Sequence, residues 1–338
     1  MFKGPCQTER QEAMEIEDGT NGGRIKEKEL NEKQECMAEC IIEKHTDADG
    51  LSELEEKQRI IDEAPFARLK IKDTNWLGLV EFRRKCDFCQ RSRKFFCYTC
   101  YHPVIPCSYF PRVKLPIKID IIKHSREIDG KSTAVHAAIL APEDVKIYTY
   151  PDFPEILNKE ETVLVFPSKD SARNMSVEDL FIREGRKCDA SEERTVFPIK
   201  RAIFIDSTWQ QTKSIYKDQR LRELRCVILK SRISQFWRHQ KKSPRWYLAT
   251  IEAIHQFLVE LHTCALGVEE DYDKFDGSMK SEKSEEFSDE HSVTNNEEIM
   301  QKYNGQYDNL LYFFKYMYEK IHSIYNHNRL QAYRRPLA

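Results

Sequence analysis

The sequence predicts an α/β protein with a four-cysteine zinc module ahead of its main domain. Short apolar runs alternate with helix-compatible stretches after residue 110, which is typical of an α/β domain. Four cysteines form two closely spaced pairs before that point. The run Ala202–Ile205, which ends in Asp206, has the composition of a strand buried on both faces of a parallel sheet.

Length and composition limit the classes of protein. A chain of 338 residues with 40% hydrophobic content suits one large domain with appendages. The formal charge of −2 hides an acidic, Ser-rich stretch at 269–298 and a mostly basic one at 213–245. No apolar run reaches the ~18 residues of a membrane span, and no apolar h-region follows Met1. We therefore expect no membrane association and reduced thiols.

The amino-terminal segment 1–65 is polar and rich in Glu and Lys. Because it lacks a sustained apolar period, we expect it to be largely disordered. The zinc module follows at 83–107, where the pattern C-x2-C-x7-C-x2-C supplies four thiolates for one structural zinc ion. These ligands are Cys86, Cys89, Cys97 and Cys100, with Cys107 as a possible spare ligand. Two disulfides are the alternative, which reducing conditions disfavour.

The main domain is expected at 110–325. The predicted strands cover residues 117–123, 145–150, 162–166, 202–205 and 227–229. The predicted helices cover residues 176–184, 209–222, 246–262 and 308–325. Between the last two helices, the acidic segment 269–305 is interpreted as a disordered insertion.

Asp206 is the first candidate for a functional residue. In open α/β sheets the ligand crevice lies beyond the carboxyl ends of the strands, so Asp206 would lie at its rim. The alternative is that Asp206 or Ser207 only caps the helix that starts at Trp209. Other polar clusters also punctuate strand or helix ends: 123–127, 130–133, Pro167-Ser168, Arg245 and 250–252. Each cluster has a plain structural alternative, such as a core histidine for His124 or a helix-face carboxylate for Glu252.

The sequence lacks G-x-G-x-x-G and Walker A patterns, which argues against a Rossmann dehydrogenase and an NTPase. The stretch Trp237–Tyr247 mixes cations with aromatic rings. Cations contact phosphates and rings stack on unpaired bases, so this stretch predicts RNA binding. A solvated turn with two aromatic anchors is the alternative, and the zinc module favours RNA.

Asp206-Ser207-Thr208-Trp209 matches the D-x-T-W motif of the DTW-domain family, which the chain resembles over roughly 80–325. Three further motifs of that family have counterparts here: His124-Ser125-Arg126-Glu127, Pro167-Ser168 and Ala249-Thr250-Ile251-Glu252-Ala253. Ser125, Ser168 and Ala249 depart from the Pro, Gly and Ser of the family pattern. The amino-acid sequences of segments 118–124, 236–241 and 305–310 are similar to those of the eukaryotic tRNA-uridine aminocarboxypropyltransferases of the family.

The resemblance implies a SPOUT-like knotted fold with an S-adenosylmethionine pocket. It implies transfer of a 3-amino-3-carboxypropyl group from S-adenosylmethionine to N3 of a uridine in the tRNA D-loop. Asp206 would be catalytic, as the base toward N3 or as an anchor for the donor. The residues expected to bind the donor are His124, Glu127, Thr133, Pro167, Ser168, Thr208, Trp209, Thr250 and Glu252. Those expected to bind RNA are Arg238, Lys241, Lys242 and Arg245.

Two other functions stay open. A SPOUT-type RNA methyltransferase would use the same donor, and a zinc-ribbon RNA-binding protein would need only the thiolates and the basic stretch. The expected partner is tRNA, without an obligate protein partner. Reduced thiols and tRNA as substrate suit the nucleus, with the cytoplasm as the alternative.

Overall fold

The computed structural model describes residues 64–168, 171–182, 196–230, 232–240, 243–273, 300–326 and 329–334. All of them belong to one compact unit, Glu53–Leu337. The segment 1–65, predicted to be disordered, lies outside the described residues except for its last two positions. Within the described ranges, every helix is too short or too polar to traverse a bilayer.

The centre of the fold is a parallel sheet of six strands in the order β6-β5-β9-β7-β10-β8. The strands are β5 Lys118–Lys123, β6 Val145–Thr149, β7 Thr162–Val165, β8 Asn174–Met175, β9 Arg201–Asp206 and β10 Arg225–Val227. The predicted α/β class and parallel sheet are confirmed. Only the short edge strand β8 was missed, because two residues carry no periodic signal.

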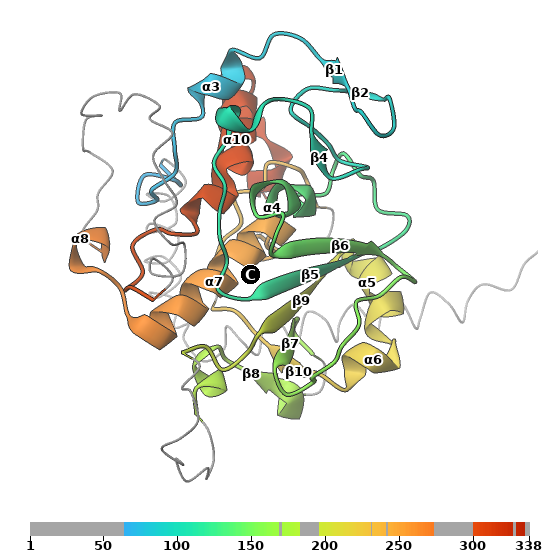
Figure 1. Ribbon diagram of the computed structural model, residues 1–338, viewed down its shortest axis with the longest axis vertical. Helices are drawn as coiled ribbons and strands as arrows, with labels where there is room; N and C mark the ends of the chain where they lie inside the picture. Colours follow the sequence, from blue (N-terminus) through green and yellow to red (C-terminus); the bar gives the residue numbers. More distant parts are fainter. Residues whose placement is uncertain are drawn as a thin grey trace, which may run out of the picture. The chain divides into compact units, whose positions relative to one another are not determined.

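Helices cover both faces of the sheet (Figure 1). On one face, Ile121 and Phe204 pack into the core that includes α4, α7 and α10. On the other face, Ile122 and Ile203 pack with Ile215 of α5 and with the α6 region. The helices are α3 Asn75–Gly78, α4 Ala134–Leu140, α5 Trp209–Tyr216, α6 Gln219–Arg222, α7 Thr250–Leu266, α8 Glu270–Asp273 and α10 Tyr312–Ile324. Burial on both faces explains the unbroken apolar run of β9.

Several helix boundaries differ from the sequence prediction. The expected helix 209–222 is two helices, because Asp218 caps a new start by accepting the N–H of Arg220. The helix expected from 246 begins at Thr250. Of the stretch 176–184, the part that the structure describes, 176–182, contains a short 3₁₀ turn instead of a helix. The described 3₁₀ turns are Cys107–Tyr109, Ser171–Arg173, Glu178–Leu180, Asp308–Leu311 and Gln331–Arg334.

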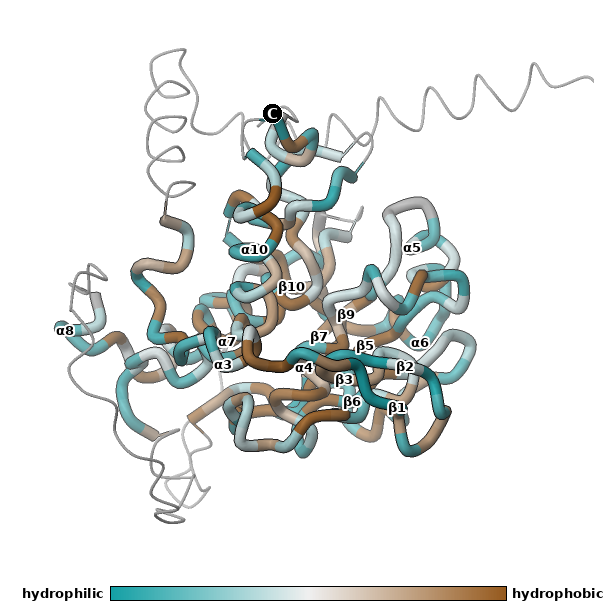
Figure 2. Tube along the Cα trace, turned by 90° about the horizontal axis from the view of Figure 1, so that it is seen from above, coloured by the Kyte–Doolittle hydropathy of each residue, from teal (hydrophilic) through white to brown (hydrophobic). Residues whose placement is uncertain are grey.

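The cysteine module consists of two antiparallel hairpins, whose strands are β1 Arg84–Lys85, β2 Ser92–Arg93, β3 Phe96–Cys97 and β4 His102–Pro103. Figure 2 shows the β1–β2 part in hydrophilic colours, as expected for an exposed hairpin. Phe95 and Phe96 instead point inward, with ring centroids 6.4 and 4.8 Å from that of Phe313 in α10. The module therefore shares its core with the main domain.

The prediction of disorder for 269–305 is wrong at both ends of this segment. Residues 270–273 form α8, and Tyr303 is fully buried and forms a bridge with Val268. The middle, 274–299, lies outside the described residues. Tyr303 escaped prediction because a single buried aromatic residue gives no periodic signal within a polar stretch.

Asp308 attaches both ends of the segment 269–305 to the rest of the fold. Its buried carboxylate accepts hydrogen bonds from the backbone N–H of Lys70, from His255 Nε2 and from the hydroxyls of Tyr272 and Tyr303. One side chain thus joins four separate stretches of the chain. Burial alone would raise the pKa of Asp308, but the bonds from His255 and Tyr303 keep that pKa below its ordinary value.

Candidate active site

Asp206 ends β9 at the carboxyl edge of the sheet, and its side chain is only 4% exposed. Ser132 Oγ donates to Asp206 Oδ2 at 2.7 Å, and Thr250 Oγ1 donates to Oδ1 at 2.6 Å. Thr208, not Asp206, is the N-cap residue of α5, and its N–H donates to Gln211 Oε1 at 3.1 Å. The capping hypothesis for Asp206 is therefore wrong. Its carboxylate instead joins β9 to the 130–133 loop and to the start of α7.

The carboxyl groups of Asp206 and Glu127 both have raised pKa values. Burial raises the pKa of Asp206, although the bonds from Thr250 and Ser132 and the charge of Lys123 oppose that rise. Burial also raises the pKa of half-buried Glu127, and the negative charge of Asp206 raises it further. Two acidic groups at one sheet edge create a site that favours a cationic ligand.

Lys123 was not among the predicted site residues. It ends β5 in register with Asp206, is buried, and forms an ion pair with Asp129. Burial opposes its charge, but the bond to Asp129 keeps the pKa of Lys123 raised. Asp129 also accepts a bond from Thr99 Oγ1 of the cysteine module at 3.0 Å. The sequence signal was present, since Lys123 ends an apolar strand as Asp206 does.

Two of the predicted donor-binding residues have structural tasks. Glu252 is 1% exposed, and its carboxylate accepts bonds from Ser234 Oγ, Gln235 N and Ala249 N at 2.6, 2.7 and 2.8 Å. Thr133 Oγ1 accepts the N–H of Ile251 at 3.2 Å. Both residues fix the amino-terminal end of α7, which carries Thr250. The Thr-x-Glu pattern here thus places the Thr250 hydroxyl against Asp206. The Ala249 contact uses its backbone N–H and needs no serine side chain.

The remaining predicted donor-binding residues follow strand ends. The backbone N–H of His124 donates to the carbonyl of Asp206 at 3.1 Å, which brings the end of β5 beside that of β9. Pro167 and Ser168 follow β7. Ser168 is buried, with its N–H on Asn174 Oδ1 at 2.8 Å and its Oγ 2.5 Å from Tyr216 Oη. Thr208 is exposed, while the side chain of Trp209 lies outside the described ones.

The two described residues among the predicted RNA-binding ones differ in exposure. Arg238 is exposed and donates to the carbonyl of Gly130 at 3.2 Å. Arg245 is only 5% exposed, and its guanidinium lies 5.4 Å from the ring centroid of Tyr333. This burial corrects the expectation of a surface cation, because the side chain is enclosed by protein. Lys241 and Lys242 lie outside the described residues.

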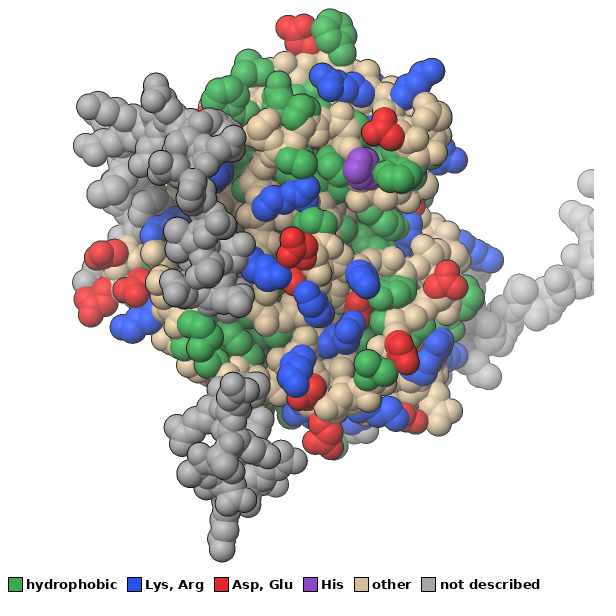
Figure 3. Space-filling view, viewed as in Figure 1, with side chains coloured by type: hydrophobic (Ala, Val, Ile, Leu, Met, Phe, Trp, Pro, Cys, Tyr) green, Lys and Arg blue, Asp and Glu red, His purple; other side chains and the backbone are tan. Residues whose placement is uncertain are grey.

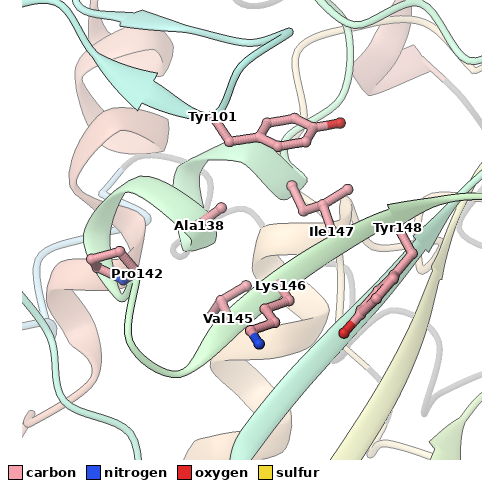
Figure 4. A pocket seen from close by; sticks show the side chains of 7 residues that line it. All are labelled: Tyr101, Ala138, Pro142, Val145, Lys146, Ile147 and Tyr148. Atoms are coloured by element: carbon pink, nitrogen blue, oxygen red, sulfur yellow. The ribbon is translucent and has the colours of Figure 1, made fainter. Parts of the chain in front are cut away.

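On the face shown in Figure 3, Lys and Arg alternate with Asp and Glu. This face therefore forms no continuous basic surface. A hollow of about 290 Å³ lies at the β6 edge, where the Tyr101 ring lies above Ala138 and Ile147 (Figure 4). None of the predicted site residues lines this hollow, so we do not assign it to the reaction.

The four cysteines fit a tetrahedral metal site. Their Sγ atoms all lie within 4.8 Å of one another, and a zinc–sulfur distance of about 2.3 Å requires sulfurs about 3.8 Å apart. Gln90 and Tyr101, which follow the second cysteine of each pair, have matching left-handed φ values of 56° and 54°. Cys107 is exposed and accepts from Arg112 Nη2 at 3.3 Å, so it lies outside this cluster.

The protein has a parallel sheet that is covered on both faces, and a four-thiol module packs on its core. Carboxylates lie at the carboxyl edge of the sheet. These features define an α/β protein built to bind a ligand at that edge. The DTW domain model matches residues 94–322. The chain belongs to the DTW-domain family. No solved structure matches the chain.

Curated relatives cover most of the chain. A tRNA-uridine aminocarboxypropyltransferase 1 of Xenopus tropicalis is 41% identical over 268 residues, which are 71% of this chain and 79% of the relative. The proteins of the same name from Mus musculus and Homo sapiens are each 40% identical over 270 residues, 71% of this chain and 77% of the relative.

Proposed function

We propose that this protein is a tRNA-uridine aminocarboxypropyltransferase that uses S-adenosylmethionine as donor. The observation that carries the proposal is the fixed carboxylate of Asp206, from the D-x-T-W motif, held by Ser132 and Thr250 at the carboxyl edge of the sheet. The curated relatives that align with this chain over most of their length are named for this activity.

The reaction moves an alkyl group to a uridine nitrogen. N3 loses its proton, a bond forms between N3 and the terminal carbon of the aminocarboxypropyl group, and the bond from that carbon to sulfur breaks. Methylthioadenosine is the leaving product. Such a transfer needs alignment of nucleophile, carbon and sulfur, and a group that accepts the proton.

The acidic site suits the charge of the donor, which carries a sulfonium and an ammonium against one carboxylate. Asp206 and Glu127 supply the negative charge. We assign Asp206 the role of a fixed anchor for the donor, because both its oxygens already accept hydroxyl bonds. Glu127 is more accessible, and its raised pKa makes it the better proton acceptor for N3.

The finer fold we propose is SPOUT-like and knotted. It is supported by β9, which enters the sheet between the two earlier strands β5 and β7. Zinc in the four-cysteine site would have a structural task, because four thiolates leave no open position for a reacting group.

Product identity tests the function. Purified protein, S-adenosylmethionine and unmodified tRNA should give an aminocarboxypropyl adduct on a D-loop uridine, located by mass spectrometry of nuclease fragments, together with methylthioadenosine. Methylated RNA with S-adenosylhomocysteine would establish a methyltransferase instead. Binding of tRNA without either product would leave an RNA-binding protein.

A further inference from the structure

A small cavity of about 160 Å³ lies between the cysteine module, the 129–133 loop and the start of α4. Its lining includes the rings of Tyr98, Phe236 and Trp237, the hydroxyl-bearing Ser132, the imidazole of His136 and the guanidinium-bearing Arg238. Pockets for drug-sized ligands typically measure about 300–1,000 Å³. This cavity therefore suits a single planar ring better than a whole nucleoside or donor molecule.

Packing holds two of these rings, Tyr98 and Trp237, which come from distant parts of the chain. Tyr98 has the Arg93 guanidinium 3.9 Å from its ring centroid, and Gly130 lies so close that an added Cβ would be 3.7 Å from the ring. Trp237 packs on Phe236 and Phe314, with ring centroids 5.3 and 5.1 Å apart. Fixed aromatic rings are the usual means of stacking an unpaired nucleobase.

His136 lines the cavity and carries a polar side chain there. It is 2% exposed, and burial lowers its pKa to about 3, so its imidazole is neutral. Among the described residues, its Nδ1 has no hydrogen-bond partner. Buried polar atoms are nearly always paired, and a uracil ring offers both N–H and carbonyl groups.

Ser132 links the cavity to Asp206, because it lines the cavity and donates a hydrogen bond to the Asp206 carboxylate. It also has two exposed cations, Arg238 and Lys131. A planar ring could come from the adenine of the donor or from a tRNA base. Only the tRNA base is flanked by phosphates, which such cations contact.

We propose that this cavity receives the uracil ring of the acceptor uridine, turned out of the tRNA and stacked near Tyr98 and Trp237. The inference rests on the proposed function and makes the cysteine module one wall of the acceptor site. His136 and Ser132 face the ring from the protein interior, and Arg238 lies where the flanking backbone enters.

Photocrosslinking tests this directly. The tRNA would carry 4-thiouridine at the acceptor position, and near-ultraviolet light would join it to neighbouring side chains of the wild-type protein. We expect crosslinks in peptides that contain Tyr98 or Trp237. Crosslinks confined to peptides outside the cavity lining would overturn the proposal.

Kinetics provide a second readout. Trp237→Leu should lower kcat/KM for tRNA by roughly 5- to 150-fold, the ratio that corresponds to ~1–3 kcal/mol of stacking per base. His136→Phe should lower it by roughly 2- to 12-fold, the ratio that corresponds to ~0.5–1.5 kcal/mol for one hydrogen bond. Affinity for S-adenosylmethionine, measured by calorimetry, should stay at the wild-type value and also report folding. Phe88→Leu is the control, because Phe88 is an aromatic residue of the other cysteine pair and is 69% exposed.

The remaining outcomes are also decisive. Equal loss of donor affinity in both variants would assign the cavity to adenine and overturn the proposal. An active wild-type protein whose cavity variants match Phe88→Leu would do the same. A wild-type protein that transfers nothing to tRNA, while donor and tRNA both bind, would instead reject the proposed function.

Discussion

Asp206 is a carboxylate that the fold buries and then supports with two hydroxyl groups. Its folded pKa lies above the ordinary value, so the folded state holds a proton more tightly than the unfolded state does. The stability that this group contributes is therefore lost as pH rises through the interval between the two pKa values. At neutral pH the buried charge is a burden on folding, which is typical of functional sites.

Asp206→Asn should separate activity from stability. The amide keeps the size of the side chain and removes the charge that anchors the donor. We therefore expect transfer at low donor concentration to fall by roughly 10- to 150-fold, the ratio that corresponds to ~1.5–3 kcal/mol for a hydrogen bond to a charged group. Thermal unfolding at neutral pH should occur at an unchanged or higher temperature. Loss of fold in this variant, or full activity, would contradict the assignment.

Ser132 and Thr250 should influence the pKa of Asp206. Each hydroxyl lowers the pKa of Asp206, so Thr250→Val or Ser132→Ala should raise that pKa further. The acid limb of the rate–pH profile should then move to higher pH, because more of the carboxyl is protonated at a given pH. Ser207→Ala is the control, since Ser207 Oγ pairs with Thr212 and not with Asp206. An unmoved acid limb in both variants would argue against Asp206 as a group that acts when ionised.

The cysteine module is tied to the 129–133 loop by more than its shared core. Thr99 donates to Asp129, the Tyr98 ring lies on Gly130, and Ser132 further along the loop holds Asp206. The metal would thus stabilise the loop that positions the catalytic carboxylate. The four-cysteine site would thus affect the reaction through this loop, without any contact between metal and substrate.

Cys89→Ser should abolish metal binding and lower activity, whereas Cys107→Ser should do neither. Elemental analysis of the wild-type protein should give about one zinc equivalent, as four thiolates form one closed site. Hydrogen exchange should report faster opening of residues 129–133 in the Cys89 variant. Retention of full zinc and activity by that variant would refute the four-thiolate site.

Strands were predictable from sequence because β7 and β9 are short apolar runs and β5 is mostly apolar. The cysteine spacing predicted the four thiols that lie together in the structure. Asp206 was placed correctly at a strand end for the same reason. Its partners could not be predicted. Ser132 is 74 positions from Asp206 in the chain and Thr250 is 44, and no local pattern encodes which distant hydroxyl meets a carboxylate. The burial of Arg245 was missed because a basic stretch looks solvated unless its tertiary neighbours are known.

The molecule buries several histidines in neutral form. Burial lowers the pKa of His136 to about 3 and also lowers that of His255 and of His262. A histidine with a lowered folded pKa contributes stability above its unfolded pKa, and this stability is lost as pH falls. Between roughly pH 6.5 and pH 3, His136 adds a slope of up to about 1.4 kcal/mol per pH unit. His255 and His262 act in the same direction.

We therefore expect the free energy of unfolding to fall steeply between pH 6.5 and pH 4, as measured by urea denaturation. His136→Phe should make that slope shallower, because it removes one proton taken up on unfolding. His124→Phe is a suitable control, since His124 is only partly buried. A slope that is identical in all three proteins would contradict the burial of a neutral imidazole at position 136.

The position of β9 between β5 and β7 has a consequence for synthesis of the chain on the ribosome. β5 and β7 emerge first, yet neither can pair with the other, because the strand that separates them ends only at Asp206. Until then both strands present unpaired edges, which are sites of aggregation. The nascent chain therefore stays incompletely folded until β9 has emerged, and the aromatic core closes only after α10 has followed it.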